Sequence, residues 1–90
     1  SGKMRARMIL APTREQAEQH RRQLLAGADF IALAHRLSSD PTSEVGGDLG
    51  FFGEGDLIPE FEQAVKALRP GQISPVIQLP SGYAVILRVN

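Results

Sequence analysis

A glycine-rich stretch at 46–64, GGDLGFFGEGDLIPEFEQA, constrains the fold of this 90-residue chain more than any other feature. Its five glycines allow the backbone a positive φ or a close approach to another segment, which other residues adopt only at a steric cost. The stretch therefore predicts tight, ordered turns. Large apolar residues lie between and after the glycines, and Pro59 suits the first position of a helix. This combination predicts an apolar pocket built from a loop and the start of a helix.

The rest of the chain predicts a small α+β domain. Apolar and polar residues alternate at 4–10, as in a half-buried strand, and Thr13 and Asp29 are candidate N-caps of two helices. The second of these helices carries one apolar stripe, formed by Phe30, Leu33, Ala34 and Leu37. Strands are expected at 4–10, 49–52, 73–78 and 83–89, and helices at 14–26, 30–37 and 59–69, with a short helical turn before Gly46. Helices covering a mostly antiparallel sheet of four strands are the expected architecture.

Charge and composition exclude several classes of function. Ten basic and ten acidic residues give a net charge of +0, so no long-range field attracts nucleic acid. Cysteine is absent, and no three or four metal ligands share a recognisable spacing, so neither a metal nor another cofactor is expected. No apolar run approaches the ~20 residues of a membrane span.

In the expected third helix, the charges follow the helix dipole. Glu60 and Glu62 are placed near the N-terminus, which is the positive end of that dipole.

The organisation of the chain is simple. A length of 90 residues allows one modest core and therefore one domain. Residues 1–3, Ser-Gly-Lys, resemble a linker end or a cloning remnant, and the first strand pattern starts at Met4. We therefore expect a single domain over 4–90 that belongs to a longer protein.

Five segments carry a family resemblance that extends from about Arg5 to Val89. MRARMILA, GADFIALAHRLSSDP, GGDLGFF, PEFEQAVKALRPGQIS and PVIQLPSGYAVILRV resemble the parvulin-type peptidyl-prolyl cis-trans isomerases, or rotamases. The resemblance implies four strands surrounded by about four helices, and isomerisation of X–Pro bonds in unfolded polypeptides as a step of protein folding. It also implies a module of a larger foldase, similar to bacterial envelope foldases, and favours the periplasm or cell envelope over the cytoplasm.

The resemblance also assigns a candidate site. It implies a proline pocket lined by Leu49, Leu57 and Phe61, with Phe52 alongside. From their spacing alone, an ordinary core is the favoured interpretation of the same residues. The resemblance favours the pocket for Leu57 and Phe61 and leaves Leu49 and Phe52 as both wall and core. Asp40 matches the position where parvulins carry a cysteine or an aspartate near the rotating bond, and a turn before Pro41 is the other interpretation of that carboxylate.

Two positions depart from the family pattern. Parvulins usually place one histidine on the first strand and one on the last, and here Met8 and Ala84 stand there, as part of the expected substrate-binding floor. Neither His20 nor His35 replaces them, and both are expected on the solvated surface. The alternative hypothesis is therefore a peptide-binding or chaperone module with weak or no catalysis. A pure scaffold or dimerisation domain is a third hypothesis, but it gives no reason for an apolar loop pocket.

Overall fold

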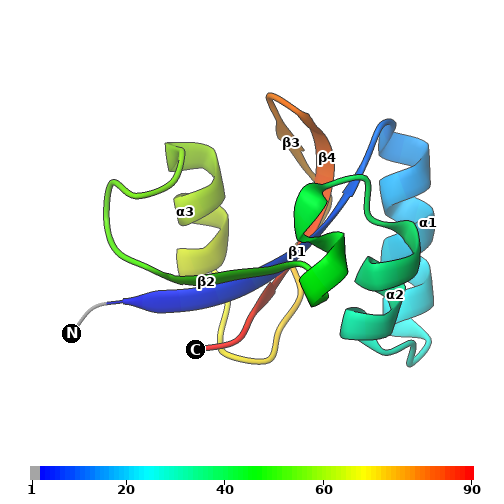
Figure 1. Ribbon diagram of the computed structural model, residues 1–90, viewed down its shortest axis with the longest axis horizontal. Coiled ribbons are helices and arrows are strands. Elements are labelled where there is room, and N and C mark those ends of the chain that lie inside the picture. Colours follow the sequence, from blue (N-terminus) through cyan, green and yellow to red (C-terminus); the bar gives the residue numbers. More distant parts are fainter. Residues whose placement is uncertain (1–2) are drawn as a thin grey trace.

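The computed structural model describes residues 3–90, and it contains a four-stranded sheet with helices on both faces (Figure 1). The elements, in chain order, are β1 (Met4–Ala11), α1 (Arg14–Leu25), α2 (Phe30–Leu37), the 3-10 helix η1 (Pro41–Val45), β2 (Asp48–Phe52), α3 (Pro59–Lys66), β3 (Ile77–Leu79) and β4 (Gly82–Arg88). The α+β prediction is confirmed, and η1 is the helical turn expected before the glycines. Ser1 and Gly2 of the expected linker end lie outside the described residues.

The sheet has the order β2-β1-β4-β3, and its neighbouring strands pair antiparallel. β1 is central, and its register with β4 places Met8 opposite Ile86 and Leu10 opposite Ala84. β2 lies at one edge of the sheet and β3 at the other. The hairpin between β3 and β4 is closed by Leu79 opposite Gly82. This topology brings residue 8 next to the last strand, although the two are separated by most of the chain.

The alternation along β1 sends side chains into two separate cores. On one face, Met8 and Leu10 pack in a cluster with Phe61 and Val65 of α3. On the other face, Ile9 packs with residues of α2 and of β4. In Figure 1, α3 lies on one side of the sheet, and α1 and α2 lie on the other. Each face of the sheet is therefore covered by a different part of the chain.

The helix caps follow the predicted chemistry, but one apolar position does not. Thr13 accepts a hydrogen bond from the Gln16 amide, and Asp29 accepts one from the Ala32 amide. Leu37, expected in the buried stripe of α2, is 39% exposed. The end of α2 is attached to β1 through Ser38 instead, whose Oγ accepts a hydrogen bond from the Leu10 amide at 3.0 Å. The stripe therefore ends one turn earlier than predicted.

The third strand is shorter than the expected range 73–78. Only Ile77–Leu79 forms a strand, and Ile73 makes an isolated bridge to Leu87. Pro75 lies between them and has no amide hydrogen to donate to a ladder. The hydroxyl of the buried Ser74 replaces part of the ladder, because it accepts a hydrogen bond from the Ile86 amide at 2.9 Å.

Candidate active site

A cavity of about 600 Å³ opens where the loop before α3, the start of α3 and the β3–β4 hairpin meet β1 and β2. Most of its wall is apolar. The lining residues are Met8, Leu49, Gly55, Asp56, Leu57, Ile58, Phe61, Leu79, Pro80 and Ser81. A mostly apolar concavity with a few polar groups at its edge is the usual form of a small binding site in proteins.

Four of the six residues predicted to bind substrate line this cavity: Met8, Leu49, Leu57 and Phe61. Phe52 does not line it, and this residue is 3% exposed within the core cluster that also contains Phe61. The Phe52 ring meets Phe61 edge to face, with 6.0 Å between centroids. Phe52 therefore supports a wall residue rather than the cavity itself.

The wall before α3 depends on a carboxylate that the sequence placed only at a helix end. Glu62 is 7% exposed, although it is charged. Its Oε2 accepts hydrogen bonds from the Gly55 amide at 2.9 Å and from the Leu57 amide at 3.0 Å. The buried acceptor is thus satisfied by backbone donors of the loop, as buried polar groups require.

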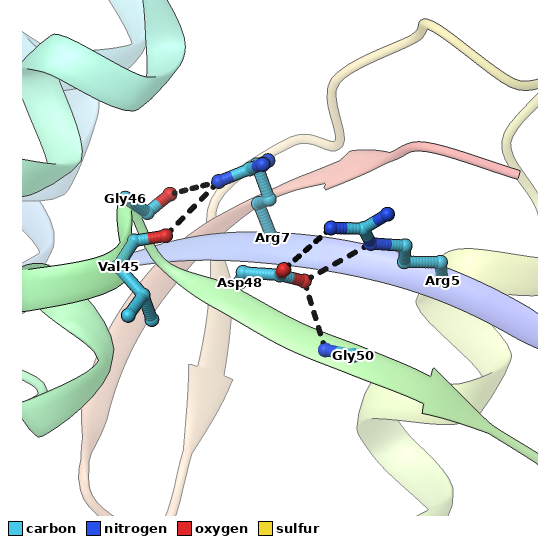
Figure 2. A network of polar contacts seen from close by, with 6 residues as sticks. All are labelled: Arg5, Arg7, Val45, Gly46, Asp48 and Gly50. Carbon is cyan, nitrogen blue, oxygen red and sulfur yellow. Dashed lines mark hydrogen bonds and ion pairs between the residues drawn. The ribbon is translucent and has the colours of Figure 1, made fainter.

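The segment that carries Leu49 is attached to β1 by a network of polar contacts (Figure 2). The Arg5 guanidinium donates to both carboxylate oxygens of Asp48, at 3.2 and 2.6 Å, and the Gly50 amide donates to Oδ1 at 2.8 Å. Arg7 Nη1 donates to the carbonyl oxygens of Val45 and Gly46. The hydrogen bond from Arg5, followed by that of the Gly50 amide and the charges of Arg5 and Arg7, lowers the pKa of Asp48 despite partial burial, and Asp48 in turn raises the pKa of Arg5.

The comparisons with known proteins agree with this geometry. A family model described as "Rotamase: PPIC-type PPIASE domain" matches residues 7–90. The chain belongs to this parvulin family of peptidyl-prolyl cis-trans isomerases. The predicted fold, isomerase class and family are thereby confirmed.

Individual relatives of this parvulin domain are foldases and chaperones by name. The chain is 44% identical over 80 residues to "Foldase protein PrsA" of Halalkalibacterium halodurans, covering 88% of this chain and 24% of that protein. It is 43% identical over 90 residues to "Chaperone SurA" of Nitrosospira multiformis, covering 90% of this chain and 20% of that protein. The crystal structure of PrsA from Bacillus anthracis superposes with a TM-score of 0.95 at 39% identity, covering 98% of this chain and 41% of that one. The parvulin domain thus spans about a quarter or less of the length of these two curated relatives.

The carboxylate of Asp40 lies outside the set of residues that line the cavity. It caps η1, where its Oδ2 accepts a hydrogen bond from the Thr42 amide at 3.0 Å and another from the Thr42 hydroxyl. The interpretation of Asp40 as a turn residue before Pro41 therefore describes its contacts in this structure. Its catalytic role stays a prediction.

The floor of this parvulin site is apolar. Met8 is 8% exposed and lines the cavity, whereas Ala84 is fully buried and does not line it. Both belong to the same core cluster, on the face of the sheet covered by α3. Because neither side chain carries a hydrogen-bonding group, the floor has no buried polar atom to satisfy at these two positions.

One histidine differs from its prediction. His35 is exposed, with Nδ1 3.1 Å from the Ser43 carbonyl oxygen. His20, also expected on the solvated surface, is half-buried instead, and its Nδ1 is enclosed without a hydrogen-bond partner among residues 3–90. Burial lowers the pKa of His20. Within the described residues, no three His, Asp or Glu side chains form a potential metal site, and no helix has the length and apolarity needed to cross a membrane.

Six further residues line the cavity without having been named as site residues: Gly55, Asp56, Ile58, Leu79, Pro80 and Ser81. The first three lie in the stretch at 46–64 that was predicted to build the pocket, whereas the other three lie outside it. The last three lie in or next to the hairpin turn, whose sequence, Leu79-Pro80-Ser81-Gly82, is typical of a link between two strands but does not assign it to the pocket. Only the register between β1 and β4 shows that this turn lies beside Met8. The sequence therefore shows that a turn is present at these residues, but the strand pairing is needed to place that turn at the cavity.

Proposed function

We propose that this parvulin domain catalyses cis-trans rotation of X–Pro bonds in unfolded or extended polypeptides, as one module, residues 4–90, of a longer foldase. The apolar cavity beside α3 carries the proposal, because it presents Met8, Leu57 and Phe61 to a bound side chain. The names of the relatives and the small share of their length that the domain covers support the wider context.

The reaction requires no covalent chemistry and no cofactor. Rotation about an X–Pro bond faces a barrier of about 18–20 kcal/mol, because amide resonance is lost in the twisted state. A catalyst lowers that barrier by binding the twisted state more tightly than the planar one. In our proposal the cavity holds the proline ring against Phe61 and Leu57 and shields the adjacent amide from water, which otherwise stabilises the planar, more polar form.

Ring binding by Phe61 is the first test. In a protease-coupled isomerisation assay, Phe61→Ala should abolish the acceleration of a proline-containing peptide, because the ring loses its contact surface. Phe51, which is 57% exposed on β2, gives the matched control Phe51→Ala, which should retain activity. Circular dichroism verifies folding, and the half-buried Leu57 provides a second variant, Leu57→Ala, with less effect on the core. Unchanged catalysis in a folded Phe61→Ala domain would refute the assignment.

The role of Asp40 can be tested separately from its capping contact. Asparagine caps helix ends about as well as aspartate, so Asp40→Asn should keep the bond from the Thr42 amide and remove only the charge. If the carboxylate acts on the rotating carbonyl, kcat/KM should fall about tenfold at unchanged melting temperature. Equal kcat/KM in the two proteins would leave Asp40 with the structural role alone.

A second candidate function follows from Met8 and Ala84, because the family's usual polar pair is absent from the floor. On this hypothesis the domain binds proline-containing segments without accelerating their rotation. Titration with a proline peptide, followed by NMR, separates the two. Shifts near Leu57 and Phe61 together with an uncatalysed rate favour the binding module, whereas an accelerated rate favours the isomerase.

A further inference from the structure

Glu62 joins α3 to the loop that forms one wall of the cavity. Its two carboxylate oxygens lie 3.2 and 2.9 Å from the Gly55 amide nitrogen, and Oε2 also lies 3.0 Å from the Leu57 amide nitrogen. These two donors lie on either side of Asp56 in the chain, so the backbone of 55–57 curves around the Glu62 carboxylate. The loop thus wraps an anion supplied by the helix that follows it.

The residues held by this contact are those that form the wall. Gly55, Asp56, Leu57 and Ile58 all line the cavity, and they are consecutive. Phe61, which lines the cavity from α3, is the immediate neighbour of Glu62. One helical turn therefore supplies both a wall residue and the carboxylate that sets the position of the opposite wall segment.

A second polar side-chain contact between this loop and α3 is an exposed ion pair, Lys66 with Glu54 at 3.4 Å. Its two side chains are 52% and 84% exposed, so solvent screens the attraction. Glu62, by contrast, is almost fully buried, and hydrogen bonds to an ionised acceptor are stronger than neutral ones. Of these two polar contacts, the buried one is therefore the stronger, and it adds to the packing of Leu57 against the core cluster.

We propose that Glu62 is a positioning residue for isomerisation, which holds the 55–58 wall at the distance from Phe61 that a proline ring requires. The inference rests on the proposed function of the cavity and extends it to a residue that does not line the cavity. Glu62 acts through Leu57 and Ile58, not on the substrate. A small displacement of a binding wall is sufficient to reduce a reaction that depends on the fit of the bound state.

An isosteric substitution tests the geometry of this contact. Glu62→Gln keeps the shape but turns one acceptor oxygen into an NH₂ group, which faces a backbone donor. We expect amide hydrogen exchange at Gly55 and Leu57 to become about tenfold faster, while exchange along β1 is unchanged. We expect kcat/KM for a proline peptide to fall about tenfold, mainly through a higher KM, because binding of the ring is what the wall provides.

Two controls separate positioning from general stability. Glu60, exposed in the same turn of α3, gives Glu60→Gln, which removes the same charge and should leave both readouts unchanged. Val65, fully buried on α3 outside the cavity lining, gives Val65→Ala. That variant should lower the melting temperature but, below it, keep KM and the exchange of Gly55 and Leu57.

The outcomes distinguish this inference from the proposed function. Unchanged exchange in Glu62→Gln, or faster exchange with kcat/KM within twofold of the wild type, overturns the positioning role. Equal losses of kcat/KM in Glu62→Gln and Val65→Ala also overturn it, since stability alone would then account for both. A wild-type domain that neither accelerates rotation nor binds the peptide overturns the proposed function, and with it any role of Glu62 in the reaction.

Discussion

Two carboxylates of the glycine-rich stretch organise the backbone around them in different ways. Asp48 joins β2 to β1, and we call the region formed by Arg5, Gly47, Asp48 and Gly50 the seam. The Asp48 carboxylate accepts hydrogen bonds from the Arg5 guanidinium and from the Gly50 amide (Figure 2). Glu62 joins α3 to the cavity wall at 55–58, and within residues 3–90 its carboxylate accepts hydrogen bonds from backbone amides alone. The seam is thus held by a half-exposed ion pair between strands, and the wall by a buried acceptor.

The glycines of the two regions also differ, in the space that surrounds their Cα atoms. Gly47 in the seam and Gly55 in the wall both have positive φ, at 78° and 85°. A Cβ at Gly47 would overlap the Met8 carbonyl oxygen, whereas a Cβ at Gly55 would have no atom within 4 Å. The seam therefore needs glycine for both space and conformation, and the wall needs it for conformation only. Close packing of backbone builds the seam, whereas the wall combines the buried Glu62 contact with the packing of Leu57 against the core cluster and leaves open space at Gly55.

The largest expected effect is that of Gly47→Ala. The new methyl group overlaps backbone of the central strand, which cannot move without breaking its pairing with β4, and the positive φ adds strain. We expect a loss of about 3 kcal/mol or more of unfolding free energy. Urea denaturation followed by circular dichroism measures it.

Gly55→Ala is the matched control in the wall. Its backbone conformation is equally unfavourable for alanine, but the methyl group meets open space, so the expected cost is about 1 kcal/mol. Similar losses in the two variants would contradict the distinction between a packed seam and an open wall. A much larger loss at Gly47 would support it.

The fold was predictable because its signals are local. The alternation along β1, the caps at Thr13 and Asp29, and the apolar stripe from Phe30 to Ala34 each lie within a few residues, and each has the predicted structure. The differences arise where tertiary contacts decide. Pro75 shortens the third strand because the missing amide hydrogen matters only once β4 is its neighbour.

The site was predictable in part, for the same reason. Leu49, Leu57 and Phe61 lie in one short segment, whereas Pro80 and Ser81 reach the cavity only through the pairing of the last strands with β1. Glu62 looked like an ordinary charge at a helix start, because its spacing fits that role. Nothing in the spacing shows that the chain before the helix folds back to donate to it.

The smallest expected effect is that of Asp48→Asn, and its pH dependence identifies its origin. The folded-state pKa of Asp48 lies below the ordinary value of 3.8, so the stabilisation is fully present above about pH 4 and is lost as the pH falls through the lowered pKa. Asparagine still accepts from the Gly50 amide but cannot pair with Arg5.

The variant should therefore be less stable than the wild type at pH 7, by less than Gly55→Ala, and the difference should shrink on acidification and at high salt. Urea unfolding at pH 7 and at pH 2.5, with the same series for Gly47→Ala, provides the measurement. The Gly47→Ala deficit is steric, so it should be similar at both pH values. A pH-independent deficit for Asp48→Asn would mean that packing, not charge, holds the seam, and the contrast between the two carboxylates would fail.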